Sequence, residues 1–126
     1  IQSHSTSNPT SFAQSGAIQA LKGPQDHLAQ WLAEFSNRRD YAHGRLTSIP
    51  GITCVNAQGA FYLFPNISGT GMKSAEFCEK LLAEQNVAAV PGVAFGSDGF
   101  IRLSYATSME NIEKGLDRLE AFVKSL

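Results

Sequence analysis

One positively charged side chain lies within a segment that is otherwise apolar or small. The composition of residues 100–106 predicts a covered β-strand. Alternation at period two divides its side chains between two faces, one with Ile101, Leu103 and Tyr105 and the other with Phe100, Arg102 and Ser104. A guanidinium keeps its charge at physiological pH, so burial of Arg102 requires an anion. That anion is either a carboxylate of the protein or the carboxylate of a ligand.

The surroundings of Arg102 bear on this choice, although on pattern alone an internal ion pair is the commoner outcome. A loop with three glycines, residues 91–99, precedes the strand and allows close approach of the backbone. The aromatic residues Phe61 and Tyr62 belong to a segment that is expected to form a neighbouring strand. The planar fork of an arginine matches a carboxylate at two points, which suits an amino acid or a keto acid.

Other residue types that commonly take part in catalysis show no catalytic pattern. All the lysines are expected on helix exteriors or in loops, where a Schiff-base lysine is not activated: Lys22, Lys73, Lys80, Lys114 and Lys124. The histidines have no metal-ligand spacing and are predicted at the surface. Cys54 and Cys78 are too far apart for a CxxC motif and are expected to be small core residues.

The composition is typical of a globular protein of one domain at most. The chain has 126 residues, 43% of them hydrophobic and 17% charged, with a formal net charge of −1. This charge gives no basic field for nucleic acid, and no apolar run approaches the roughly 20 residues of a membrane span. We therefore expect neither nucleic acid nor a membrane as a partner. Two cysteines without a disulfide framework favour a cytoplasmic location.

The first half of the chain is predicted to be helical. Asn8 and Pro9 are good starting residues for a helix that extends to Lys22. A long helix over 24–48 is expected to follow. Both helices carry apolar residues that we expect to be buried, namely Phe12, Ile18 and Leu21 in the first and Leu28, Trp31, Leu32, Phe35, Ala42 and Leu46 in the second.

The second half alternates short strands with helices. Segments 52–55 and 60–64 are expected to pair as an antiparallel hairpin, and 87–90 is expected to be a buried strand. Ser74 is predicted to cap a helix that carries Phe77, Leu81 and Leu82, and Thr107–Glu110 forms a capping box for the last helix. These elements predict an α+β fold: a small, mostly antiparallel sheet of three or four strands with helices on one face, preceded by a long helix.

Four segments, in their order and spacing, resemble a known family. They are Asn-Pro-Thr-Ser at 8–11, Gly-Ala-Phe-Tyr at 59–62, Val-Pro-Gly-Val-Ala-Phe-Gly at 90–96 and Ile-Arg-Leu-Ser-Tyr-Ala at 101–106. The chain resembles the C-terminal third of fold-type I aminotransferases, and within them the prokaryotic-type aspartate aminotransferases of class I. The similarity covers essentially the whole chain.

The resemblance implies roles for individual residues. It implies that Arg102 binds the α-carboxylate of the substrate and that Phe61 and Tyr62 line the substrate site. Ser7 and Asn8 would lie near the cofactor, pyridoxal 5'-phosphate, at a subunit boundary. The residues that hold this cofactor in the family correspond to positions before Ile1, so no catalytic residue is assigned in this chain.

The resemblance also implies a division of the chain. Residues 1–23 would be the trailing segment of the large cofactor-binding domain. Residues 24–126 would be the small C-terminal domain, with the long helix over 24–48 as the bridge. The intact homodimeric enzyme would move an amino group between an amino acid, aspartate in the first instance, and a 2-oxo acid, whereas the fragment alone is expected to be inactive.

Two other functions are compatible with the residues. The chain could be a free-standing module that binds amino acids through Arg102, or a structural domain in which Arg102 is salt-bridged. Specificity among aspartate, aromatic and prephenate-type substrates stays open, because the family's specificity residues lie mostly upstream of Ile1.

Overall fold

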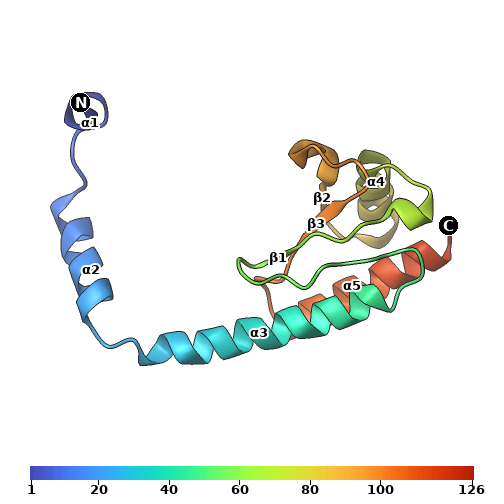
Figure 1. Ribbon diagram of the computed structural model, residues 1–126, viewed down its shortest axis with the longest axis horizontal. Helices are drawn as coiled ribbons and strands as arrows, with labels where there is room; N and C mark the ends of the chain where they lie inside the picture. The colour runs from blue at the N-terminus through green and yellow to red at the C-terminus, as the bar shows by residue number, and fades with distance from the viewer. The chain divides into compact units, whose positions relative to one another are not determined.

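The computed structural model describes the backbone of residues 1–126 and all side chains except those of residues 2 and 3 (Figure 1). The chain forms two compact units, Ile1–Leu32 and Ala33–Leu126, and each is described here by itself. In the part of the chain that the structure describes, no helix has both the length and the apolarity needed to cross a membrane.

The first unit is helical. It contains α1 (Gln2–Ser5), α2 (Ser11–Lys22) and the first residues of α3 (Asp26–Thr47). Helix α2 begins at Ser11, two residues after the predicted start at Pro9. Thr10 occupies its N-cap position with extended backbone. The Pro9 carbonyl instead accepts a hydrogen bond of 2.9 Å from the side chain of Gln14.

The predicted burial of the α2 side chains is wrong. Phe12, Ile18 and Leu21 are 79%, 57% and 84% exposed. In α3 the predicted apolar stripe is exposed at Leu28, Trp31 and Leu32 and buried at Ala42 and Leu46. Helical periodicity locates an apolar face, but a face is buried only where another element packs on it. Such packing begins in the second unit.

The second unit contains a three-stranded antiparallel sheet in the order β1-β3-β2. The strands are β1 (Tyr62–Leu63), β2 (Val90–Pro91) and β3 (Ile101–Ser104). In the registers of the two ladders, Tyr62 faces Ser104 and Val90 faces Arg102. The strand that carries Arg102 is therefore the central one.

The strand pairing differs from the predicted hairpin. Segment 60–64 pairs with β3 rather than with 52–55. Thr53 forms an isolated antiparallel bridge with Asn66, through backbone hydrogen bonds of 3.1 and 2.7 Å. The predicted strand over 87–90 begins only at Val90. Short strands leave the choice of partner to the loops and the core, which local alternation does not encode.

The remaining helices are α4 (Ser74–Gln85), α5 (Met109–Lys124) and two 3₁₀ turns, η1 (Ser68–Thr70) and η2 (Gly92–Phe95). The predicted apolar stripe of α5 is confirmed, with its buried residues at Ile112, Leu116, Leu119 and Phe122. Its N-cap is Ser108, whose Oγ accepts from the Asn111 amide at 3.3 Å, not the predicted Thr107. In α4 Phe77 and Leu81 are buried, whereas Leu82 is 54% exposed.

One hydrophobic core holds the second unit together. Side chains of α3, α4 and α5 pack in it against Leu63 of β1 and Ile101 of β3, both at most 2% exposed. The phenyl rings of Phe77 and Phe122 meet edge to face, with 5.1 Å between their centroids. The prediction of an α+β fold with a small antiparallel sheet is therefore confirmed.

Two glycines of the second unit are expected to respond in opposite ways to substitution by alanine. A Cβ at Gly115, inside α5, would meet no atom within 4 Å. Gly115→Ala should raise the free energy of unfolding by about 0.5–1 kcal/mol, because alanine loses less backbone entropy in a helix. Urea denaturation followed by circular dichroism measures this change.

The matched variant Gly92→Ala should lower the same free energy. A Cβ at Gly92 would overlap the carbonyl oxygens of Ser97 and Phe100, both of which belong to backbone. Equal stability of the two variants would contradict the packing described here.

Candidate functional site

Arg102 is held at the centre of the sheet by aromatic rings. Its side chain is partly buried, and its guanidinium carbon lies 4.4 Å from the ring centroid of Tyr62 and 4.9 Å from that of Phe95. Among the residues whose side chains are described, no carboxylate lies within 4.0 Å of it and no group accepts a hydrogen bond from it. The salt bridge required by the structural-domain alternative is therefore not observed.

The register of the sheet explains the contact with Tyr62. Tyr62 is directly opposite Ser104, so the two side chains share a face of the sheet. Arg102 is two residues from Ser104 along β3 and shares this face. Diagonal neighbours across an antiparallel pair are within reach when one side chain is aromatic and the other long. The predicted alternation along β3 thus places Arg102 beside Tyr62.

Phe95 comes from a different part of the chain and was not predicted. It ends the 3₁₀ turn η2, and its ring meets Phe64 edge to face at a centroid distance of 5.9 Å. Phe64 in turn stacks on Phe100 at 5.1 Å. The sequence showed Phe95 within a glycine-punctuated loop, but no periodic pattern indicates where a loop side chain points.

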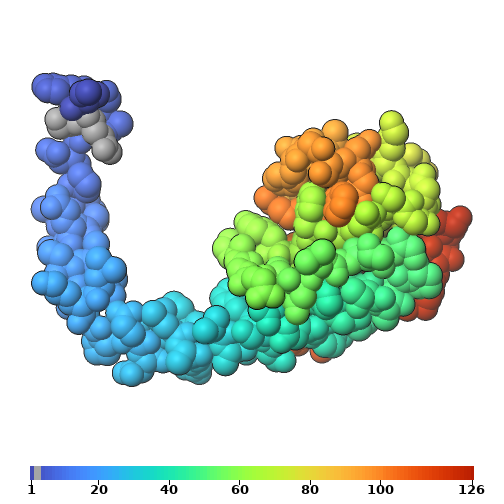
Figure 2. All heavy atoms as spheres, viewed as in Figure 1, coloured from blue at the N-terminus to red at the C-terminus, as the bar shows by residue number. Residues whose placement is uncertain are grey.

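The loop that carries Phe95 is tied to the start of α4. Ser74 is fully buried, and its Oγ donates a hydrogen bond of 2.8 Å to Asp98 Oδ1. Ser74 Oγ also accepts a hydrogen bond of 3.1 Å from the backbone N–H of Val93. Ser74 is the first residue of α4 rather than its predicted cap. In Figure 2 the orange atoms of this loop form part of the surface of the second unit.

The other predicted site residues each have their own surroundings. Phe61 is 42% exposed and packs on the ring of Tyr62 at a centroid distance of 4.4 Å. Ser7 and Asn8 belong to the first unit and are exposed, with Ser7 in the left-handed region at φ 60°. Tyr62 therefore has a described contact with Arg102, and the roles of Phe61, Ser7 and Asn8 stay predictions.

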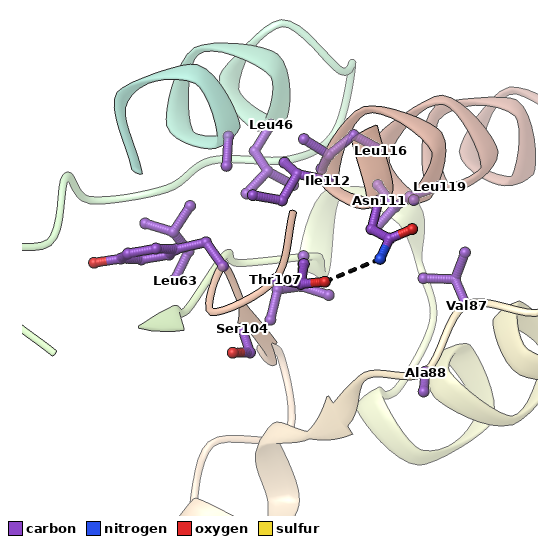
Figure 3. Close-up of a pocket in the computed structure, with 14 residues that line it drawn as sticks. Leu46, Leu63, Val87, Ala88, Ser104, Thr107, Asn111, Ile112, Leu116 and Leu119 are labelled. Atoms are coloured by element: carbon purple, nitrogen blue, oxygen red, sulfur yellow. Dashed lines mark hydrogen bonds between the residues drawn. The ribbon is translucent and has the colours of Figure 1, made fainter. Parts of the chain in front are cut away.

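The opposite face of β3 is apolar. Leu103 and Tyr105 border a pocket of about 190 Å³ between the sheet and helices α3 and α5 (Figure 3). At its edge the Thr107 hydroxyl accepts from the Asn111 side chain at 3.1 Å. None of the described residues that line it is charged. The two faces of one strand thus differ sharply, and the charge is on the face opposite the core.

Burial favours the protonated form of both cysteine thiols. Burial raises the pKa of Cys78 to about 11, and this thiol is 8% exposed. Burial also raises the pKa of Cys54, against a smaller opposing effect from a backbone hydrogen bond with Phe64. His43, predicted at the surface, is partly buried and hydrogen-bonds the carbonyl oxygen of Cys54 at 3.0 Å. These groups support packing rather than catalysis.

Metal ligation is also not indicated. Among the described residues, no group of three or more His, Cys, Asp or Glu side chains lies close enough together to hold a metal ion. The geometry leaves a single candidate site, in which an arginine on the central strand faces a group of aromatic rings. The chemistry that suits it is the binding of a carboxylate.

Residues 1–119 match the family model for aminotransferases of classes I and II. The chain belongs to this aminotransferase family. It is 46% identical to the aspartate aminotransferase of Bacillus subtilis over 129 residues, which cover 98% of this chain and 33% of that protein. It is 45% identical to a probable aspartate/prephenate aminotransferase of Rickettsia felis, over 95% of this chain and 32% of that protein.

Solved aminotransferases have the same fold. The aspartate aminotransferase of Rhizobium meliloti superposes with a TM-score of 0.92 at 38% identity, over 98% of this chain and 33% of that one. The aromatic aminotransferase of Pyrococcus horikoshii also gives 0.92 at 38% identity, over 98% and 34%. The chain thus spans about a third of the length of these aminotransferases, and the predicted family is confirmed.

Aminotransferases of this family imply pyridoxal 5'-phosphate in the intact enzyme, but the lysines of this chain do not fit a covalent bond to it. All of them are exposed, and four lie within 4.0 Å of a carboxylate: Lys73, Lys80, Lys114 and Lys124. A lysine becomes nucleophilic at neutral pH when it is desolvated or next to another cation. None of these lysines has that environment.

The raised pKa of Cys78 predicts a pH dependence of stability. An unperturbed thiol has a pKa of 9.0, and that of folded Cys78 is about 11. The folded state therefore keeps its full advantage below pH 9 and loses it as the pH rises toward 11, because only the unfolded chain ionises readily. Urea titrations at pH 8 and pH 10.5 should show a smaller loss of stability for Cys78→Ala than for the unmodified chain. An identical loss in both would contradict the assignment.

Proposed function

We propose that the complete protein containing this chain transfers an amino group between an amino acid and a 2-oxo acid, and that Arg102 binds the α-carboxylate of both substrates. The observation that carries this proposal is the partly buried guanidinium of Arg102, which has no carboxylate partner among the described side chains. A cation held in this way needs an acid from outside. Membership of the aminotransferase family supplies the class of acid.

Arg102 would act by orientation. Two parallel N–H···O hydrogen bonds from one guanidinium fix both the position and the plane of a carboxylate. The substrate Cα is bonded directly to that carboxylate, so its position is fixed as well, and such positioning lowers the barrier of the reaction. Pyridoxal 5'-phosphate supplies the electron sink for such chemistry when it is bound. Arg102 itself neither gives nor takes a proton, because a guanidinium stays charged in proteins.

The finer assignments belong to the same proposal. We propose aspartate as the amino donor, since the relative from B. subtilis is an aspartate aminotransferase. Phe61 would line the substrate site beside Tyr62, and Ser7 and Asn8 would lie near the cofactor at a subunit boundary of a cytoplasmic homodimer. Residues 1–23 would continue the large domain, and 24–126 would form the small one. These assignments rest on the resemblance of the motifs.

The test is the substitution Arg102→Lys in the complete enzyme. Lysine keeps the charge but replaces the two-point fork by a single ammonium, so one charge-assisted hydrogen bond is lost. A loss of about 1.5–3 kcal/mol corresponds to a fall in kcat/KM for aspartate of roughly 10- to 150-fold, mostly through KM. Steady-state kinetics with aspartate and 2-oxoglutarate measure this fall.

Arg118→Lys is the matched control. Arg118 is exposed on α5 and donates to the Gln85 carbonyl oxygen at 3.3 Å, away from β3. Its kinetics should equal those of the unmodified enzyme. Equal kinetics for Arg102→Lys would remove Arg102 from the substrate site.

The isolated chain distinguishes this function from that of a free-standing amino-acid-binding module. A chain that contributes only one of the substrate contacts should show no heat of binding with aspartate at millimolar concentration. Isothermal titration calorimetry measures this directly. Saturable binding at micromolar aspartate would favour the module and contradict the proposal.

A further inference from the structure

Two arginines of the second unit are held in opposite ways. Arg45 donates to the Tyr41 hydroxyl at 2.8 Å, to Asp117 at 2.6 Å and to Glu120 at 3.2 Å. The guanidinium of Arg102 contacts two aromatic rings, and its central carbon lies 4.4 and 4.9 Å from their centroids. No described side chain or backbone group accepts a hydrogen bond from this guanidinium. A cation–π contact uses the charge of a guanidinium without occupying its N–H donors. The donors of Arg102 are thus kept available for a ligand.

Of the two rings that contact Arg102, that of Phe95 is not part of the hydrophobic core. It is 48% exposed and contributes little to the buried core. Its loop is nevertheless tightly fixed. Gly92 is packed against the carbonyl groups of Ser97 and Phe100 so closely that no Cβ fits there.

The start of α4 fixes the same loop from the other side. The buried Ser74 hydroxyl joins the carboxylate of Asp98 to the backbone of Val93, with bonds of 2.8 and 3.1 Å. The Ser74 amide donates to the Asp98 carbonyl oxygen at 2.9 Å. These bonds connect the two ends of the segment in which Phe95 lies. An exposed ring carried on so constrained a loop is held for its contact with Arg102 and Phe64.

We infer that Phe95 is a positioning residue for Arg102: its ring holds the guanidinium in place while leaving the N–H donors free for the substrate α-carboxylate, and the Ser74–Asp98 hydrogen bonds hold Phe95. This inference rests on the proposed function, since it takes Arg102 as the carboxylate-binding group. Phe95 has no role of its own in proton transfer. Its effect reaches the substrate only through the guanidinium.

The experiment compares two amino donors that differ only in the α-carboxylate. L-Alanine and ethylamine are each reacted with the complete enzyme in single turnovers, followed by the absorbance of the cofactor. For Phe95→Leu we expect the rate constant divided by the dissociation constant to fall about 3- to 10-fold for alanine, which is the value of one cation–π contact. The reaction of ethylamine should be unchanged, because it does not engage Arg102.

Further variants separate this role from a general effect on folding. Phe95→Tyr keeps the ring face and should restore the reaction with alanine, whereas Phe95→Met keeps the length without the ring and should behave as Phe95→Leu does. Ser74→Ala should reproduce the defect specific to alanine. Leu82→Ala, on the exposed side of α4 at 54% exposure, is the control and should change neither donor. Thermal melting of each variant identifies any that fails to fold.

The outcomes also separate this inference from the proposed function. A defect for alanine in Arg102→Lys without one in Phe95→Leu and Phe95→Met would overturn the role of Phe95 and leave that of Arg102. An equal loss with alanine and ethylamine in both Phe95 variants would show a structural role and also overturn it. Unchanged kinetics in Arg102→Lys would refute both.

Discussion

In the second unit, the partly buried guanidinium of Arg102 has no carboxylate partner among the described side chains. A partly buried guanidinium without an acceptor is costly, and a cation–π contact offsets only part of that cost. Arg45 shows the usual solution, in which hydrogen bonds to Asp117 and Tyr41 raise its pKa further above an already high value. Arg102 lacks that solution and stays partly exposed to water. Under the proposed function, the carboxylate of the substrate supplies the missing counter-ion.

The architecture serves to hold this one side chain on a rigid element. β3 is hydrogen-bonded on both edges, to β1 and to β2, although each ladder is only two residue pairs long. The core side of β3 is anchored by Ile101 and Tyr105, 0% and 4% exposed, against side chains of α3 and α5. Because the backbone of Arg102 is fixed in this way, the remaining freedom is that of its side chain, which the rings restrict.

Local sequence patterns were sufficient for some of these features and not for others. Alternation along β3 correctly separated Arg102 from Ile101 and Tyr105, because the side-chain period of a strand is set by the backbone. The partners of β3 were not predictable from two-residue strands, and the pairing of 52–55 with 60–64 was wrong. Phe95 was missed because its place depends on the tertiary bonds of Ser74 and Asp98. The exposure of Phe12 and Leu21 shows the same limit, since periodicity specifies a face but not what covers it.

Under the proposed function, an arginine held by rings rather than by an acid suits reversible binding of a carboxylate. A carboxylate of the protein placed beside the guanidinium would compete with every substrate at an effective concentration in the millimolar range or above. The apparent affinity for a substrate carboxylate would fall by the fraction of arginine so occupied. Aromatic rings exert no such competition, because they attract the cation through the ring face and accept no strong hydrogen bond from it. If Arg102 binds one acid and releases another, as proposed, rings such as those of Tyr62 and Phe95 hold it with less competition than an aspartate or a glutamate would.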